Sequence, residues 1–230
     1  NHDDDSGVFT MKGLWIKDLK LMAAQKYFFL LILLIAIGMS ISAEDVSMMT
    51  FPLGFVPFVV SLFGLSTISY DEFDNGNAFL FTLPITRKEY VLEKYALSFV
   101  LAFVSLVMMF LFTIFMAAQK GMLLYFDGWM IPFGLYAFIL LLQAIMIPFH
   151  LKFGQERGRI AIIVLIGALL LIATFIQKGL EFIGIDWMQV LQSLSILGQG
   201  TMLILLYGVS FVLLIISLKV SIHIVSKKEF

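Results

Sequence analysis

Six apolar segments, each close to the length that crosses a lipid bilayer, recur along this chain of 230 residues. A helix needs about 20 apolar residues to cross a hydrocarbon core of roughly 30 Å. The segments have no charged residue in their middle, so none has the polar face of a helix at a protein–water boundary. The pattern therefore predicts helices that face lipid. They run over Tyr27–Ser42, Phe51–Ser69, Tyr95–Ala118, Met130–Phe149, Ile160–Ile176 and Thr201–Leu218.

The composition excludes an ordinary water-soluble enzyme. Apolar residues make up 61% of the chain and charged residues 13%, against roughly 45–50% and about 25% in soluble domains. The segments lack the alternation of apolar and polar residues that marks membrane β-strands, whereas α-helices pair their own backbone groups inside lipid. We therefore expect an all-α membrane protein with six transmembrane helices. The net charge of −1 gives no sign of a nucleic-acid partner.

Lys and Arg residues fall almost entirely on one side of the six predicted spans. If the N-terminus and every second loop share a side, that side holds thirteen of the fifteen Lys and Arg residues. Only Lys120 and Lys178 lie on the other side. Because short cytoplasmic loops carry an excess of Lys and Arg, both termini are predicted to be cytoplasmic.

The N-terminal region divides into two parts. Residues 1–10 are polar and acidic and precede a Met-Lys pair typical of a native start, so we interpret them as an appended tag. In residues 11–26, Trp15, Leu19 and Met22 recur at helical spacing, while lysines project elsewhere. This pattern predicts an amphipathic helix that lies in the membrane interface. Such a helix either only anchors the chain or acts as an elbow that transmits movement.

The longest predicted cytoplasmic loop is residues 70–94, between the second and third spans. Two acidic residues, Asp71 and Glu72, precede an Asn-Gly-Asn turn signal at residues 75–77. A short apolar stretch follows, and Pro84 ends it. The loop is either a solvated hairpin or, since exposed apolar patches mark interaction sites, a surface for a protein partner. The apolar residues of this stretch are Phe79, Leu80, Phe81 and Leu83.

The end of this loop carries a helix start signal. Thr86 and Glu89 have the spacing of a capping box, in which each side chain accepts a hydrogen bond from the backbone N–H of the other residue. The pattern predicts a helix that begins there and continues into the third span.

Two further loops complete the predicted organisation. Residues 149–159 form a cytoplasmic turn, in which Gly154 and Gly158 are expected to break the helix. Its basic residues, which include Lys152 and Arg157, face either the anionic leaflet or an acidic partner. On the outer side, residues 174–200 form either a re-entrant helical hairpin or an irregular interfacial loop.

The residue types needed for catalysis are missing from the chain. It has no cysteine, and its three histidines are too far apart in sequence to form a zinc-binding pair. The pattern G-x-x-x-x-G-K-[ST] of a nucleotide-binding loop is absent, so any nucleotide must be bound by another chain. We therefore predict no catalytic residue and no metal site. Gln143, in the fourth span, is expected to hydrogen-bond across helices.

Three stretches of sequence resemble the type 2 ABC exporter permeases, the transmembrane subunits that have no fused ATPase. They are ISYDE at residues 68–72, TLPITRKEYVLEKY at residues 82–95 and IPFHLKFGQERGR at residues 147–159. Within that group, the bacterial exporters of phenol-soluble modulins and other amphipathic peptides are the most similar. The resemblance covers residues 11–230, because the elbow helix, the six spans and the cytoplasmic termini all agree with this fold.

The resemblance implies a permease in the cytoplasmic membrane of a bacterium that pairs with a second copy of itself or with a homologous permease. Two ABC-type ATPase subunits would bind it, holding the ATP and Mg²⁺, and no cofactor would belong to this chain. Their docking site would be a coupling helix at about Phe73–Leu83. Polar contacts from Asp71, Glu72, Arg87 and Glu89 would flank it, with Lys152–Arg159, including Arg157, as a second contact.

The apolar, Phe-rich spans suit an amphipathic or lipid-like substrate, such as a cytolytic or antimicrobial peptide, better than a sugar or an ion. A rival interpretation is a membrane scaffold or immunity protein that sequesters a peptide without transport. An intramembrane enzyme is a third class, but it would need polar catalytic groups inside the spans, and the sequence supplies almost none.

Overall fold

The computed structural model describes residues 2–73, 76–83, 85–121, 131–184 and 198–228, and within them every regular element is a helix. For residues 2–11, 46–47, 155–166, 168–169, 172–173, 176 and 199 it describes the backbone alone. The helices are α1 (His2–Ala24), α2 (Lys26–Ser42), α3 (Val46–Glu72), α4 (Gly76–Leu80), α5 (Arg87–Gln119), α6 (Ile131–Phe182) and α8 (Gly198–Lys227).

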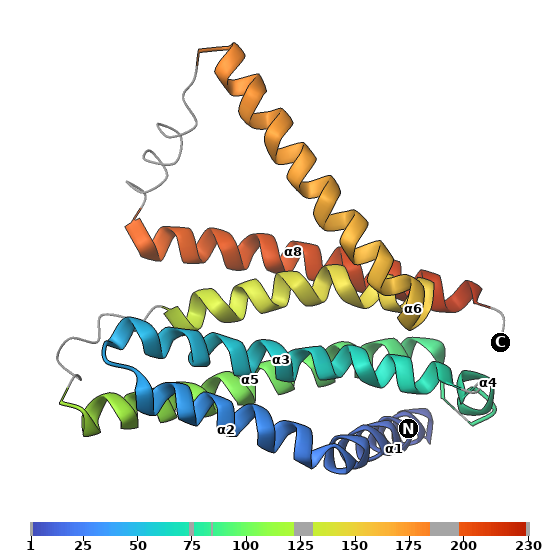
Figure 1. Ribbon diagram of the computed structural model, residues 1–230. Helices are drawn as coiled ribbons and strands as arrows, with labels where there is room; N and C mark the ends of the chain where they lie inside the picture. Colours follow the sequence, from blue (N-terminus) through green and yellow to red (C-terminus); the bar gives the residue numbers. More distant parts are fainter. Residues whose placement is uncertain (1, 74–75, 84, 122–130, 185–197, 229–230) are drawn as a thin grey trace.

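The long helices lie side by side in a bundle, with α3 packed against α2, α5 and α6, and α8 packed against α5 and α6 (Figure 1). The short helix α4 lies at one end of this bundle. Helix α1 and the C-terminal end of α8 lie at the same end, which we call the α4 end. Segments that are far apart in the sequence therefore meet there.

The N-terminal region forms two helices that meet at a bend. The axes of α1 and α2 differ by 63°, and the break falls at Gln25. An amphipathic helix was expected over residues 11–26, and the structure extends it back to His2, through the segment interpreted as a tag. Leu14 and Asp18, four residues apart, form its buried face, whereas Leu19 is exposed.

Four helices among the described residues are long and apolar enough to cross a membrane, or five if α1 and α2 form one bent span. The four are α3, α5, α6 up to Gly154, and α8. The fifth predicted span, Ile160–Ile176, lies in the second half of α6, and many of its side chains are outside the described residues. The total of six spans and their orientation stay predictions.

Helix α6 changes direction at Gly154. This residue has φ 70° and ψ −176°, and the chain beyond it rises away from the bundle (Figure 1). The prediction that Gly158 also breaks the helix is wrong, because helical backbone resumes directly after Gly154. Of the predicted re-entrant segment 174–200, the described ends belong to α6 and α8, and residues 185–197 lie outside the described part.

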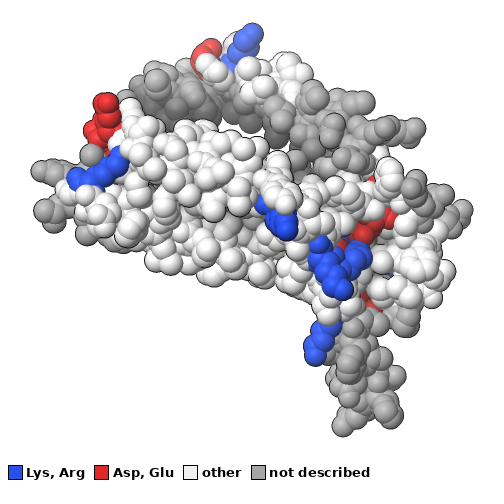
Figure 2. Space-filling view, turned by 60° about the horizontal axis from the view of Figure 1, so that its bottom comes forward, with Lys and Arg blue, Asp and Glu red and all other residues white. Residues whose placement is uncertain are grey.

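The surface of the bundle is apolar over its length. Large exposed side chains include Phe103, Met108 and Leu111 on successive turns of α5. In the space-filling view the middle of the bundle is broadly uncharged, and most of the charged side chains lie toward its ends (Figure 2). Such a surface is stable beside lipid rather than water.

Candidate functional site

Helix α5 begins with the capping box that the sequence predicts. The backbone N–H of Glu89 donates to Oγ1 of Thr86 over 3.2 Å, and the backbone N–H of Thr86 donates to Oε2 of Glu89 over 2.8 Å. The cap ties the end of the 70–94 loop to the first turn of a 33-residue helix. Glu89, one of the predicted partner contacts, therefore has an intramolecular role.

Three apolar side chains of the same loop are exposed at the α4 end. Phe73 and Phe79 are each 71% exposed, and Leu83 is 43% exposed. Phe79 and Leu83 border a groove of about 510 Å³ between α1 and α4, whose other wall includes Leu14. We call Phe73, Phe79 and Leu83 the apolar loop surface.

The remaining apolar residues of the loop pack inward. Leu80 is buried, and the ring of Phe81 meets that of Tyr90 edge to face, with 5.6 Å between ring centroids. The guanidinium of Arg87 lies 5.8 Å from the centroid of the Phe81 ring. Arg87 also donates to the carbonyl oxygens of residues 225 and 226, at the C-terminal end of α8. These residues fix the loop to the bundle.

Asp71 lies in a buried ionic cluster that sequence reasoning missed. Nζ of Lys94 lies 2.5 Å from Oδ2 of Asp18 and 2.8 Å from Oδ2 of Asp71. It also donates to Oγ1 of Thr67 over 3.2 Å. Lys17 forms a second ion pair with Asp71. The cluster therefore joins α1, α3 and α5, and it leaves Asp71 little surface for a partner.

The sequence does carry a signal for this cluster: its buried charged residues lie four positions from buried residues on the same helix. Lys94 lies four residues after Tyr90 and four before Ser98, on the face of α5 that is buried. On α1, Asp18 follows the buried Leu14 by four residues. A charged residue in line with buried residues on its helix is expected to have an oppositely charged partner.

Glu72 joins α3 to the hinge of α6 and to the C-terminal end of the chain. Its Oε1 lies 2.5 Å from Nζ of Lys228, which also donates to the carbonyl oxygen of Leu151 over 3.2 Å. The other predicted contacts in this region are Lys152, which is exposed, and Arg157, whose side chain lies outside the described residues.

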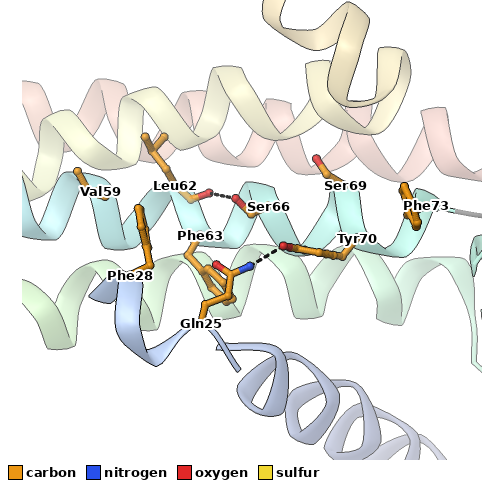
Figure 3. Close-up of a pocket in the computed structure, with 9 residues that line it drawn as sticks. All are labelled: Gln25, Phe28, Val59, Leu62, Phe63, Ser66, Ser69, Tyr70 and Phe73. Carbon is orange, nitrogen blue, oxygen red and sulfur yellow. Dashed lines mark hydrogen bonds between the residues drawn. The ribbon is translucent and has the colours of Figure 1, made fainter. Parts of the chain in front are cut away.

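A pocket of about 530 Å³ opens between the α1–α2 bend and α3 (Figure 3). Gln25 and Phe28 come from the bend, and the other lining residues come from α3 and from Phe73, which directly follows it. Nε2 of Gln25 donates to the hydroxyl of Tyr70 over 2.6 Å, across one edge of the pocket. The polar part of the lining includes Gln25, Ser66, Ser69 and Tyr70; the apolar part comprises Phe28, Val59, Leu62, Phe63 and Phe73.

This architecture defines the class of the protein: it is a multi-pass helical membrane protein. The model of the family described as ABC-2 family transporter protein matches residues 13–226. The chain therefore belongs to the ABC-2 transporter family, and it is a permease subunit of an ABC transporter. Comparisons with curated proteins and with solved structures give no match.

Members of this family are membrane components that are generally not catalytic themselves; they usually dimerise and work with ATPase subunits. Family membership confirms the permease class that the resemblance implied. It also favours transport over the rival interpretation of a membrane scaffold.

Proposed function

We propose that this permease is half of the membrane part of an ATP-driven exporter that moves an amphipathic or hydrophobic substrate, such as a cytolytic or antimicrobial peptide, out of the cell. The α4 end faces the cytoplasm, and two separate ATPase subunits, which hold ATP and Mg²⁺, bind there. The observation that carries the proposal is the apolar loop surface. Its Phe73, Phe79 and Leu83 are exposed, and Phe79 and Leu83 border a groove, although burying such side chains is favourable.

The loop that carries this surface is bound to three other elements. The capping box connects it to α5, the pair of Asp71 with Lys94 connects α3 to α5 and α1, and Glu72 connects α3 to the end of α8. Movement of a docked ATPase would therefore displace several helices together. ATP can drive transport only if the bundle has two arrangements that the ATPase biases.

The pocket beside the α1–α2 bend suits part of an amphipathic substrate. Its aromatic and aliphatic side would hold an apolar side chain, while Ser66, Ser69 and the Gln25–Tyr70 pair offer hydrogen bonds. Its volume of about 530 Å³ lies within the roughly 300–1,000 Å³ of ordinary ligand pockets. It therefore accommodates a few residues of a peptide rather than a whole peptide helix.

Docking is tested by Phe73→Asp and Phe79→Asp in a chain co-expressed with a candidate ABC-type ATPase subunit that co-purifies with the parent chain. We expect each change to weaken co-purification of the ATPase by about 30-fold or more, because it places an unpaired charge in a desolvated contact. Phe79→Leu, which keeps the surface apolar, should retain the ATPase. Unchanged co-purification of both Asp variants, at equal membrane content, would show that the docking assignment is wrong.

Substrate binding is tested with a fluorescent amphipathic helical peptide and the purified chain. Ser66→Phe fills the pocket and should reduce peptide binding at least about tenfold, whereas Ser42→Phe, at the exposed end of α2, should not. Equal binding by both variants would exclude this pocket. If the peptide binds but ATP never drives its release from loaded vesicles containing the ATPase, the sequestering scaffold is the better interpretation.

A further inference from the structure

A second groove opens on the outer surface of the bundle, away from the loop and the pocket described above. It has a volume of about 290 Å³ and lies between α5, α6 and α8. Phe99 and Ile215 on its walls are 44% and 42% exposed, so the groove faces outward, where the bundle meets lipid. The residues that shape it include Leu92, Tyr95, Phe99, Gln143, Ile215 and Leu218.

The polar groups in this groove already have hydrogen-bond partners. The hydroxyl of Tyr95 lies 2.5 Å and 2.8 Å from the hydroxyl oxygens of Ser217 and Ser221 on α8. Nε2 of Gln143 donates to the carbonyl oxygen of Ser98 over 3.0 Å, which confirms the cross-helix bond that the sequence predicts. What remains accessible is mainly apolar, as a hydrocarbon chain requires.

Two lysines lie beyond the groove toward the α4 end. Lys88 precedes Leu92 by four residues on α5, and Lys219 follows Ile215 by four residues on α8. Residues four apart share a helix face, so each lysine continues one wall of the groove. Both side chains are exposed, and neither has an ion pair or hydrogen bond with a described residue.

The acidic residues closest in sequence to Lys88 are engaged elsewhere. The carboxylate of Glu89 accepts hydrogen bonds from Thr86. Glu93 is fully buried and lies 3.5 Å from Nζ of Lys94 in the ionic cluster. The α4 end of the groove therefore combines an apolar cleft with two lysines that have no ionic partner among the described residues.

We propose that this groove binds an acidic phospholipid, with one acyl chain between α5 and α8 and the phosphate between Lys88 and Lys219. An apolar helix of a second copy would fill the cleft but would leave both ammonium groups without a counter-ion. An uncharged lipid would also fill the cleft and leave both ammonium groups without a counter-ion. Charge complementarity thus selects the acidic lipid, and the site is independent of the proposed export function.

Native mass spectrometry of the purified full-length chain tests the site, with palmitoyl-oleoyl phosphatidylglycerol and the matching phosphatidylcholine as probes. Lysines near an anionic lipid surface each contribute about fivefold in affinity. The affinity of the double variant Lys88→Gln/Lys219→Gln for the acidic lipid should therefore fall about 30-fold. Its affinity for phosphatidylcholine, whose choline group offsets the phosphate charge, should fall much less. The control Lys20→Gln/Lys26→Gln removes two exposed lysines on α1 and α2, helices that do not line the groove, and should keep the preference for the acidic lipid.

Ala96→Phe and Ile215→Trp test the acyl-chain cleft. Both add bulk to the lining, and Ile215 is at an exposed position that tolerates a larger side chain. We expect weaker binding of both lipids. If neither variant changes lipid binding, or if glycerol phosphate binds as tightly as the acidic lipid, no acyl-chain site exists. If Ile215→Trp instead separates dimers into monomers, the groove is a contact between copies and the proposal is wrong.

Discussion

Nζ of Lys94 lies 2.5 Å from Oδ2 of Asp18, a residue 76 positions earlier in the chain, and the two side chains are 0% and 1% exposed. The pair fastens the N-terminal helix to the start of α5. With Asp71 as a second partner of Lys94, it joins three helices at the end of the bundle that carries the apolar loop surface.

Removal of Lys94 should destabilise the protein strongly. Lys94→Met leaves Asp18 and Asp71 buried without their shared cation, and breaking a buried pair in this way costs about 3–5 kcal/mol. The free energy of unfolding in detergent measures the effect. Adding Asp18→Asn to Lys94→Met should recover part of the loss. Lys88→Met, at an exposed position, serves as the control and should change stability by less than about 0.5 kcal/mol.

Glu93 should respond in the opposite way. Its carboxylate oxygens are buried and have no hydrogen-bond partner among the described residues, and the cluster holds three carboxylates against the two ammonium groups of Lys17 and Lys94. Glu93→Gln removes one buried negative charge, so we expect equal or greater stability. A loss of more than about 2 kcal/mol would show that the charge of Glu93 stabilises the cluster.

The capping box gives a test with a conservative control. Thr86→Ala removes the acceptor for the backbone N–H of Glu89 and should cost about 1 kcal/mol. Glu89→Gln keeps an acceptor for the N–H of Thr86, since Gln also serves in this motif, and should be nearly neutral. Chemical denaturation of the two variants beside the parent chain measures both values. Equal stabilities would mean that the cap contributes nothing.

Any side chain at Gly154, the hinge of α6, should destabilise the protein. Its φ of 70° disfavours other residues, and a Cβ there would lie 2.9 Å from Oε2 of Glu72. Gly154→Ala should therefore lower the unfolding free energy by at least about 1 kcal/mol. Gly167→Ala, in the helical part of α6 with no atom near the added Cβ, should instead raise it by up to about 1 kcal/mol. The same sign for both changes would contradict the hinge assignment.

Helices α3 and α5 approach each other closely at Gly64. A Cβ on Gly64 would lie 2.8 Å from Cβ of Ser98 and 3.1 Å from its Cα, so Gly64→Ala must push the helices apart. Small residues allow such close contact between membrane helices. We expect a loss of about 1–3 kcal/mol, measured by thermal unfolding in detergent. Gly38→Ala, which meets no atom within 4 Å, is the matched control and should show no loss.

Features that depend on neighbouring residues could be predicted from the sequence. The capping box of Thr86 and Glu89 needs only residues three apart, and the cross-helix bond of Gln143 follows from the cost of leaving an amide unpaired in an apolar helix. The break at Gly154 was predicted for the same local reason, whereas Gly158 continues the helix. A glycine permits a break but does not require one.

The placement of charged side chains could not be predicted in the same way. Asp71 and Arg87 were predicted to contact an ATPase, yet Asp71 pairs with Lys94, and Arg87 binds carbonyl groups of α8. Phe79 and Phe81 belong to one apolar stretch, but only Phe79 is exposed, because Phe81 packs on Tyr90. The amino-acid sequence of the loop does not indicate which of the two rings is exposed and which packs on the bundle.

The sequence by itself determined that this chain is a helical membrane protein and where α5 begins, because both follow from interactions within about 20 residues: contact with lipid, backbone pairing and capping. Only the tertiary structure decided that Asp18, Asp71 and Lys94 share one buried site. Their pairing depends on which faces of α1, α3 and α5 meet, and that is determined by packing among helices that the chain brings together from distant positions.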